Sequence, residues 1–580
     1  MQTNDMSIRL GGEAGQGVQS TGTGFCQALG RSGLNFFARE DYRSQIRGGQ
    51  NFFEIRIGTE ELFTHKDEAD LLIALAPETV EKHLEEVVSG GGIIFEEDEK
   101  LAGKIEEEGL KSFPVPLKEI AKEEGGAEVM ANTAAIGVAC GLTGFDLDYV
   151  EEIVEENFSA KGEAVVRNNV KVARAGRRYA REHLADFPYA LEAPGAEGKR
   201  LVLDGNRAFS LGALASGCNF ISAYPMTPST SIFETLTKYA QEYGVVSKQT
   251  ESELAAINMA LGASHVGARA LVSTSGGGFA LMAEALSLAG MTETPVVIAE
   301  VQRPGPSTGL PTRTEQGDLS FVVNVGHGEF PRLVLTPGTI EEYFQAGARA
   351  FNLAERYQTP VIVLADQHLA DSLRPIPWEA IDMEDVEIDR GKLLSGEELD
   401  QLENYKRHEL TEDGISPRAL PGHPNAVFDT TGNEHDERGK ITEDPEMREK
   451  MVEKRAQKLE QAGKEVFPLK RYGPGEAEVT FLGWGSSYGA IREATAELNE
   501  DGRSANFYHL PQVWPLPEEE LKEVFAGSKR TVMVEGNNES QLAHLIRSRL
   551  GEGPDASILK YDGRPLTPDY ILSKLSGLNF

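Results

Sequence analysis

Short apolar runs that end in turns and lead into helices recur along most of this sequence, and this alternation constrains its fold more than any other feature. Strands and helices that alternate at such a pace are typical of parallel α/β sheets. The sequence therefore predicts an α/β fold made of parallel-sheet units. The runs expected to form strands are 6–10, 52–57, 71–76, 92–96 and 111–115, then 200–203, 220–223, 269–273, 295–300, 332–335 and 360–365, then 478–482, 506–509 and 531–535.

The 580 residues are enough for three or four domains of ordinary size. A stretch rich in Pro, Gly and Ala at 186–198 is a predicted linker. After the second set of strands, charged stretches and scattered Pro and Gly surround one polar helix, expected at 445–462. That composition predicts an extended connector with little core. The expected division is three α/β units at 1–190, 191–375 and 471–580, with the connector at 376–470.

The chain is strongly acidic, with 57 Lys and Arg against 92 Asp and Glu, which gives a net charge of −35. Such a surface repels phosphate backbones and anionic lipids, so we expect neither nucleic-acid nor membrane-surface binding. The sequence has no apolar run of bilayer length, and its start has no signal-peptide pattern. These features predict a cytoplasmic protein. The acidic excess is typical of a halophile, with an acidic mesophile as the alternative.

Cysteine and histidine positions predict no metal or iron–sulfur site in this chain. Cys26, Cys140 and Cys218 are far apart and form no C-x-x-C pair. Such thiols indicate a reducing compartment. The histidines of the connector lack zinc spacing and are expected to face solvent or to pack; they are His408, His423 and His435.

The glycine-rich turn GGEAGQG follows the first expected strand and opens a helix. Free backbone N–H groups at a helix start bind anions. The dinucleotide spacing G-x-G-x-x-G is incomplete, because Gly15 and Gly17 are followed by Ser20. We expect an anion or a partner at Gly15, Gly17 and the nearby Arg47, with a tight strand–helix turn as the alternative. An NAD(P)-binding protein is disfavoured, because no acidic residue about 20 positions on has a convincing ribose context.

Two prolines frame Thr227 where an apolar strand ends. Pro228 disfavours the helical conformation at Thr227, which therefore lies on a stiff turn at the carboxyl end of the strand. Open α/β sheets bind ligands at that edge. We expect the Thr227 hydroxyl to donate to a substrate carboxylate. The alternative is that Thr227 or Ser229 caps the following helix.

The segment that begins at Thr250 combines an apolar helix with a run of glycines. Thr250 and Glu253 fit a capping box, which would account for Glu253 without any catalytic role. A strand then leads into Gly276, Gly277 and Gly278. A sharp turn needs only one glycine, so three of them predict a ligand that approaches the backbone closely.

A stiff loop at 300–319 carries Arg303 and Arg313 among three prolines and three glycines. Two guanidinium groups at a sheet edge suit bidentate capture of a carboxylate. The alternative is that they pair with the neighbouring Glu315 or Asp318.

In these stretches the sequence resembles the α subunits of 2-oxoacid:ferredoxin oxidoreductases with a γ domain fused ahead, and most closely the 2-oxoglutarate branch. Only Met226 departs from the family pattern, where Ile would be more usual in YPMTP, and this change is conservative. The resemblance covers nearly the whole chain except the connector. The segments that carry it are GGEAGQGVQSTG from Gly11, YPMTPST from Tyr224, ESELAAINMALGAS from Glu251, STSGGGFALMAEALSLAGMTETPVV from Ser273, RPGPSTGLPTRTEQGDL from Arg303, FLGWGSSYGAI from Phe481 and VMVEGNNESQLAHLIR from Val532.

The resemblance implies a Rossmann-like γ domain, a pyrimidine-type domain that binds thiamine diphosphate, and a transketolase C-terminal-like domain. It also implies a β subunit that shares the thiamine diphosphate and supplies Mg²⁺ and a [4Fe–4S] cluster. In agreement, the sequence has no G-D-G with a downstream Asn to hold Mg²⁺ and diphosphate. The expected assembly is two α and two β chains, with ferredoxin as electron acceptor. Such a chain alone would be inactive.

The reaction implied is the CoA-dependent oxidative decarboxylation of 2-oxoglutarate to succinyl-CoA and CO₂; pyruvate or a branched 2-oxoacid is the alternative substrate. Glu253 matches the family's catalytic carboxylate at the aminopyrimidine, with Glu251 as the weaker alternative. Thr227 and Arg313 match the positions that recognise the 2-oxoacid, and Arg303 lies on the same loop. A non-catalytic scaffold subunit would be expected to lose Glu253 or Thr227. The expected cofactor contacts are Tyr224, Pro225, Glu253, Gly276, Gly277 and Gly278, and the possible anion, CoA or partner loop is Gly15, Gly17 and Arg47.

Overall fold

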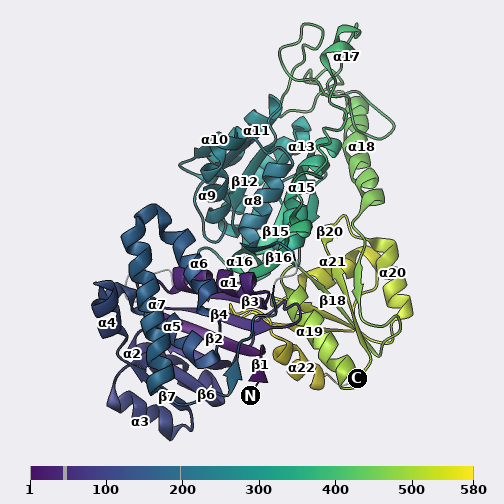
Figure 1. The fold of residues 1–580 in the computed structure, drawn as a ribbon. Coiled ribbons are helices and arrows are strands. Elements are labelled where there is room, and N and C mark those ends of the chain that lie inside the picture. The colour runs from purple at the N-terminus through teal and green to yellow at the C-terminus, as the bar shows by residue number, and fades with distance from the viewer. Residues whose placement is uncertain (1, 43–48, 196–197, 579–580) are drawn as a thin grey trace. The chain divides into compact units, whose positions relative to one another are not determined.

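The chain folds into two compact units in this computed structural model (Figure 1). Both consist of sheets covered by helices, which confirms the expected α/β class. Among the described residues, no helix is long and apolar enough to cross a membrane. The residues described are 2–42, 49–195 and 198–578. The first unit is Met1–Leu203 with Asp371–Ala380, and the second is Asp204–Ala370 with Ile381–Phe580.

The core of the first unit is an eight-stranded sheet. Its strands, in spatial order, are β7 (Lys111–Val115), β6 (Val87–Glu96), β5 (Ala69–Ala74), β2 (Met6–Glu13), β4 (Gln50–Gly58), β3 (Asn35–Asp41), β16 (Leu373–Pro377) and β9 (Arg200–Asp204). Strands β2, β5, β6 and β7 are parallel, whereas β4 is antiparallel to β2 and β3. The sheet is therefore mixed, because the chain between β3 and β4 is too short for a crossover helix. The run at 200–203, expected to begin the second α/β unit, instead forms the edge strand β9.

Helices cover this sheet, and two of them approach each other unusually closely. Figure 1 shows α5 (Ala131–Thr143) and α7 (Glu163–His183) side by side. A Cβ atom on Gly137 would lie 2.1 Å from the Ala173 carbonyl oxygen, so glycine permits this backbone contact. The other helices are α1 (Val18–Ser32), α2 (Pro77–His83), α3 (Glu99–Glu107), α4 (Leu117–Ile120) and α6 (Leu147–Phe158), and β1 (Gln2–Thr3) pairs with β8 (Tyr189–Ala190) inside the expected linker.

The second unit contains a seven-stranded sheet with parallel neighbours from β11 to β14. Its order is β11 (Val246–Gln249), β10 (Phe220–Ala223), β12 (Ala270–Thr274), β13 (Val296–Gln302), β15 (Pro360–Asp366), β14 (Leu333–Leu335) and β20 (Gln512–Trp514). Strand β20 comes from the last part of the chain and pairs antiparallel with β14. The helices are α8 (Gly205–Ala215), α9 (Thr230–Lys238), α10 (Ala240–Tyr243), α11 (Glu253–His265), α12 (Gly276–Leu281), α13 (Ala283–Thr292), α14 (Leu319–Asn324), α15 (Ile340–Tyr357) and α16 (Gln367–Asp371).

A five-stranded sheet completes the second unit, and four helices surround it in the yellow-green part of Figure 1. The order is β17 (Lys470–Tyr472), β19 (Ala505–Leu510), β18 (Val479–Trp484), β21 (Thr531–Glu535) and β22 (Ala556–Leu559). The helices are α19 (Ser487–Glu500), α20 (Glu518–Gly527), α21 (Gln541–Leu550) and α22 (Pro568–Ser576). All neighbours are parallel except β17 and β19, so this sheet fits the prediction of a third α/β unit.

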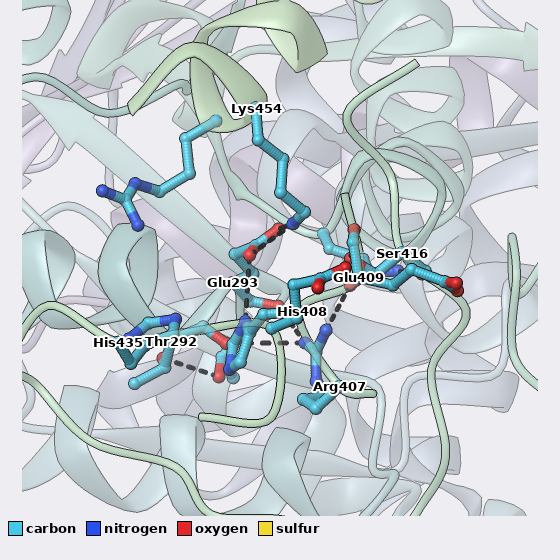
Figure 2. Close-up of polar contacts among 12 residues, drawn as sticks. Thr292, Glu293, Arg407, His408, Glu409, Ser416, His435 and Lys454 are labelled. Carbon is cyan, nitrogen blue, oxygen red and sulfur yellow. Dashed lines mark hydrogen bonds and ion pairs between the residues drawn. The ribbon is translucent and has the colours of Figure 1, made fainter. Parts of the chain in front are cut away.

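The connector contains two α-helices, α17 (Gly396–Asp400) and α18 (Pro445–Ala462). As expected it has little apolar core, with one small cluster that includes Leu399 and Tyr405. Yet α18, which is polar on nearly every face, buries Lys454 and Lys458. Both ammonium groups bind the buried carboxylate of Glu293, which follows α13. Figure 2 shows the contact with Lys454. Ion pairs therefore replace apolar packing where the connector meets the seven-stranded sheet's helices.

Candidate functional site

The carboxyl edge of the seven-stranded sheet brings several of the expected site residues together. Strands β10, β12 and β13 are consecutive neighbours in this sheet. The turn with Thr227 follows β10, the glycine run follows β12, and the loop with Arg303 and Arg313 follows β13. The Arg303 guanidinium donates to the Thr227 carbonyl, with Nη1 2.8 Å from the oxygen. This is the edge at which open α/β sheets bind ligands.

Glu253 is the first residue of α11, and the expected capping box does not form. The N-cap is Ser252, whose hydroxyl accepts from the Ala255 N–H at 3.3 Å. The Thr250 hydroxyl donates to the Ser252 carbonyl instead. Glu253 is only 4 % exposed, and its Oε1 has no hydrogen-bond partner among the described residues. Helix capping therefore does not explain this buried carboxylate.

The glycine run is the place where two carboxylates approach the backbone. A Cβ atom on Gly278 would lie 2.8 Å from Glu253 Oε1 and 2.2 Å from Thr274 Oγ1. A Cβ atom on Gly276 would lie 2.3 Å from Asp318 Oδ2. Any larger residue at either position would displace a carboxylate. Glycine is thus required at both ends of the run. Gly277 is exposed, and a Cβ atom there would lie 3.9 Å from its nearest neighbour, the Ser307 carbonyl oxygen.

Glu300 and Asp318 form a buried carboxyl pair beside this run. Burial, reinforced by the Asp318 carboxylate, raises the pKa of Glu300 well above its usual range. Burial also raises the pKa of Asp318 to about 6, although the hydrogen bond from Glu300 and the charge of Arg303 act in the opposite direction. Neither Glu300 oxygen has a donor partner among the described residues, which agrees with a Glu300 carboxyl that keeps its own proton and shares it with Asp318.

Sequence reasoning did not identify Glu300 as a site residue, and it treated Asp318 only as a possible partner of the loop arginines. Burial lowers the pKa of Arg303, and the charge of Asp318 opposes this shift. The direct contact of the Arg303 guanidinium is with the Thr227 carbonyl. A charged residue within the apolar strand β13 was the signal that could have revealed Glu300.

The Thr227 turn is held by contacts from outside helix α9. Ser229 is the N-cap of α9, but its hydroxyl donates to the Met226 carbonyl at 2.8 Å and makes no capping bond. The Asn206 amide donates to the Pro228 carbonyl at 2.9 Å. Thr227 itself is half-buried, and Tyr224 is 42 % exposed.

Arg313 lies on the far limb of the same loop. It is half-buried, and a Cβ atom on Gly563 of the C-terminal segment would lie 3.3 Å from its Cβ. The following residue, Thr314, is buried and donates from its hydroxyl to Asp366 at 3.2 Å. The two arginines therefore share one loop, and the contact with the Thr227 turn comes from Arg303.

The glycine-rich turn near the N-terminus belongs to the first unit. Gly15 and Gly17 have positive φ angles of 99° and 73°, and Gly17 is the N-cap of α1. The Asn132 amide donates to the Gln16 carbonyl at 3.2 Å and ties the turn to α5. These angles fit the tight-turn alternative. Arg47, expected beside this turn, lies outside the described residues.

A second group of titratable side chains lies beneath the connector. Ligand atoms of Glu293, His408 and His435 are all within 4.8 Å of one another, and all three residues are buried. The two ammonium groups on Glu293 oppose a cation there. Burial lowers the pKa of His408 to about 3, so this ring is neutral. These histidines were expected either to face solvent or to pack. His408 and His435 are buried, so they pack in the interior.

Comparisons with known proteins agree with this architecture. Residues 211–454 match the family described as "Pyruvate flavodoxin/ferredoxin oxidoreductase, thiamine diP-bdg", and residues 7–179 match "Pyruvate ferredoxin/flavodoxin oxidoreductase". The 2-oxoacid:ferredoxin oxidoreductase subunit alpha of a Sulfolobus species is 33 % identical, over 98 % of this chain and 96 % of the relative. The 2-oxoglutarate oxidoreductase subunit KorA of Mycobacterium tuberculosis is 31 % identical, over 93 % of this chain and 87 % of the relative.

A solved structure resembles the whole chain. It is the 2-oxoglutarate:ferredoxin oxidoreductase from Magnetococcus marinus with 2-oxoglutarate, coenzyme A and succinyl-CoA bound. Its TM-score is 0.91 at 34 % identity, and the match covers 99 % of both chains. The similarity therefore includes the connector, which the sequence resemblance leaves out.

Proposed function

Because the chain belongs to the family of 2-oxoacid:ferredoxin oxidoreductase alpha subunits, we propose that it acts in the CoA-dependent oxidative decarboxylation of 2-oxoglutarate. The products are succinyl-CoA and CO₂, and ferredoxin accepts the electrons. The choice of 2-oxoglutarate is supported by the relatives named for that acid and by the solved enzyme that holds it. The observation that carries the proposal is the buried Glu253 carboxylate, whose Oε1 at the glycine run has no hydrogen-bond partner within the part of the chain that the structure describes.

Glu253 and the glycines fit the aminopyrimidine end of thiamine diphosphate. When bound, this cofactor supplies a carbon nucleophile, and a carboxylate at the aminopyrimidine ring promotes its formation. An unpaired, buried carboxylate oxygen needs a donor, and a protonated ring nitrogen would provide one. The exposed backbone at Gly277 leaves room for a ligand. Tyr224 and Pro225 are also exposed, in the turn that follows the neighbouring strand β10. Glu253 would hold and release the proton at this nitrogen.

Thr227, Arg303 and Arg313 would bind the 2-oxoacid. A guanidinium group pairs with a carboxylate through two parallel hydrogen bonds. Arg303 is held against the Thr227 turn by a hydrogen bond, so it supplies a positioned cation at this edge. The Thr227 hydroxyl adds a neutral donor. These side chains orient the substrate and must not hold its carboxylate so tightly that decarboxylation is opposed.

The enzyme has further subunits, as the alpha-subunit names of the relatives state. We propose a β subunit that contributes Mg²⁺ and a [4Fe–4S] cluster, in an assembly of two α and two β chains located in the cytoplasm. The sequence offers no C-x-x-C pair, and its three cysteines are buried. Large apolar side chains are exposed around the site and suit a partner surface; they are Tyr224, Leu254, Leu281, Leu310 and Phe321.

The proposed domains are those of the sequence analysis, at 1–190, 191–375, 376–470 and 471–580. With these bounds, β9 comes from the beginning of the second domain and β16 from its end, and both strands belong to the sheet of the first domain.

The test is the Glu253→Gln variant in the assembled enzyme. Gln keeps the size of the side chain but cannot take up the proton. We expect thiamine diphosphate to bind, while hydrogen–deuterium exchange at its reactive carbon and turnover of a 2-oxoacid panel fall by about 10²-fold or more. The matched control is Glu251→Gln, because Glu251 lies in the same turn but is exposed. Wild-type exchange in Glu253→Gln would refute the assignment, and loss of exchange only in Glu251→Gln would transfer it to that residue.

A further inference from the structure

The loop that carries Arg303 and Arg313 is closed at its base. Gln302, the last residue of β13, accepts from the Asp318 N–H at 3.0 Å and donates to the Ala365 carbonyl at 3.1 Å. The loop therefore starts and ends at the same point of the seven-stranded sheet. Beyond these contacts and those of Arg303 and Thr314, the loop is attached to the C-terminal five-stranded sheet.

Gln316 makes four hydrogen bonds to that sheet and is 2 % exposed. Its backbone N–H donates to the Gly536 carbonyl at 2.7 Å, and its Oε1 accepts from the Gly536 N–H at 2.8 Å. Its Nε2 donates to the Trp484 carbonyl at 2.8 Å, and its own carbonyl accepts from the Asn537 amide at 3.1 Å. The backbone N–H, the backbone carbonyl and both polar atoms of the side chain of Gln316 thus all bond to the same edge of the C-terminal sheet.

The partners of Gln316 lie where two neighbouring strands end. Trp484 is the last residue of β18, and Gly536 follows β21, which is parallel to β18. This is the carboxyl edge at which an α/β sheet normally receives a ligand. A Cβ atom on Gly485 would lie 2.8 Å from Gln316 Nε2, so the sheet edge leaves room for this side chain. Gln316 therefore occupies the ligand edge of the C-terminal sheet.

The edge that receives Gln316 is rigid. The buried Glu535 carboxylate accepts from Trp484 Nε1 at 3.1 Å and from the Leu542 N–H at 3.0 Å. Next to Leu542, Gln541 donates to the Gly317 carbonyl at 2.7 Å and accepts from the Ser320 N–H at 2.8 Å. The loop limb after Arg313 is thereby fixed at successive residues.

We infer that Gln316 is a positioning residue that clamps the arginine loop to the C-terminal domain and so holds Arg313 in place for the 2-oxoacid. The substrate part of this inference rests on the proposed function; the clamp itself rests on the contacts of Gln316. The C-terminal domain then contributes to substrate affinity through the position of the loop. The position requires glutamine, because one planar group must donate to Trp484 and accept from Gly536. Glu would set an acceptor against the Trp484 carbonyl, and Asn is one methylene too short.

The experiment compares Gln316→Ala and Gln541→Ala in the enzyme assembled with its partner subunit. Trypsin reports on the loop directly, because it cleaves after Arg313 but not after Arg303, which precedes Pro304. In the intact clamp Thr314 is buried, so this bond is protected. We expect cleavage after Arg313 to accelerate about tenfold in Gln316→Ala. The KM for 2-oxoglutarate should also rise about tenfold, with a smaller change in kcat.

The matched control is Gln512→Ala. Gln512 is equally buried at 2 % exposure and bonds Phe467 and Pro515, away from the loop. Its loss should leave both the cleavage rate after Arg313 and the KM at wild-type values. Gln541→Ala keeps the inference testable if Gln316→Ala does not fold, because it loosens the loop from the C-terminal side.

Two results would overturn the inference in different ways. Unchanged protection of the Arg313–Thr314 bond in both folded variants would show that Gln316 does not clamp the loop. Faster cleavage with an unchanged KM for every 2-oxoacid would show that the clamped loop does not serve substrate binding, which would refute the substrate role proposed for Arg313. Faster cleavage together with a raised KM supports both the clamp by Gln316 and the substrate role of Arg313.

Discussion

The Lys454 ammonium group lies 2.6 Å from each carboxylate oxygen of Glu293, in an ion pair whose side chains are 1 % exposed (Figure 2). Lys458, one turn later on α18, binds the same carboxylate. Their charges hold the pKa of Glu293 well below its usual range, although burial alone would raise it. A helix without an apolar face is thus attached to the domain by buried charge.

Replacing Glu293 by Gln should destabilise the protein strongly. The change leaves the ammonium groups of Lys454 and Lys458 buried without their counter-charge, and breaking a buried pair in this way costs about 3–5 kcal/mol. Chemical denaturation followed by fluorescence measures the loss. The control is Lys440→Met, because Lys440 and its partner Asp429 are exposed and such a pair contributes less than about 1 kcal/mol. Equal stability of the two variants would contradict the role given to Glu293.

Gly278→Ala should impair the site through Glu253. The new methyl group would lie 2.2 Å from Thr274 Oγ1 and 2.7 Å from Glu253 Cγ. We expect a loss of about 1–3 kcal/mol in stability from overpacking, with a fall in turnover beyond what the unfolded fraction explains. Gly277→Ala is the control for stability, since its methyl group would lie 3.9 Å from its nearest neighbour, the Ser307 carbonyl oxygen. Thermal unfolding without cofactor separates the two variants, and identical unfolding would argue against the close approach.

Glu300→Gln should be well tolerated at neutral pH. The raised pKa of Glu300 means that the folded protein holds this carboxyl in its neutral form, and Gln can still donate to Asp318. We expect stability within about 1 kcal/mol of wild type at pH 7. A raised folded-state pKa gives stability that is lost as the pH rises through it. The wild type should therefore lose more stability than Glu300→Gln on going to alkaline pH, as melting temperatures across a pH series would report. Parallel pH profiles would disprove the buried neutral carboxyl.

Arg313→Ala should weaken the use of 2-oxoacids while cofactor binding changes little. Loss of a desolvated charge pair costs about 2–5 kcal/mol in kcat/KM. Arg313→Lys keeps the charge but loses the planar fork, so it should restore only part of the loss. Thr227→Ala removes a neutral hydrogen bond worth about 1 kcal/mol. Steady-state kinetics of the assembled enzyme gives these values. A wild-type specificity constant for every 2-oxoacid in Arg313→Ala would leave the loop with a structural role only.

The chain purified alone should be inactive with thiamine diphosphate, 2-oxoglutarate and CoA. The motivation is that its sequence lacks the G-D-G and downstream Asn of a diphosphate site and the C-x-x-C of a cluster site. Co-expression with the partner subunit should restore activity and raise the particle mass to that of two α and two β chains, measured by light scattering. Full turnover by the isolated chain would refute the shared site.

Much of the local structure followed from the sequence. The helix at Pro445–Ala462 has the expected bounds, and so does the strand Lys111–Val115. These elements depend on apolar spacing, prolines and glycines that are close together in the chain. The turns with Thr227, Gly276 and Arg303 were each expected to follow a strand, and parallel neighbours place such turns at one edge of the sheet.

The sequence by itself determined the α/β class, the family and the turns that carry the proposed site, because these features are written in short stretches of neighbouring residues. Only the tertiary structure decided that Ser252 rather than Thr250 caps the helix of Glu253, that Glu300 and Asp318 share a buried site, and that Gln316 reaches Trp484 across 168 positions. Burial, and with it the cost of an unpaired charge or amide, depends on every element that packs around a group. No local pattern contains that information.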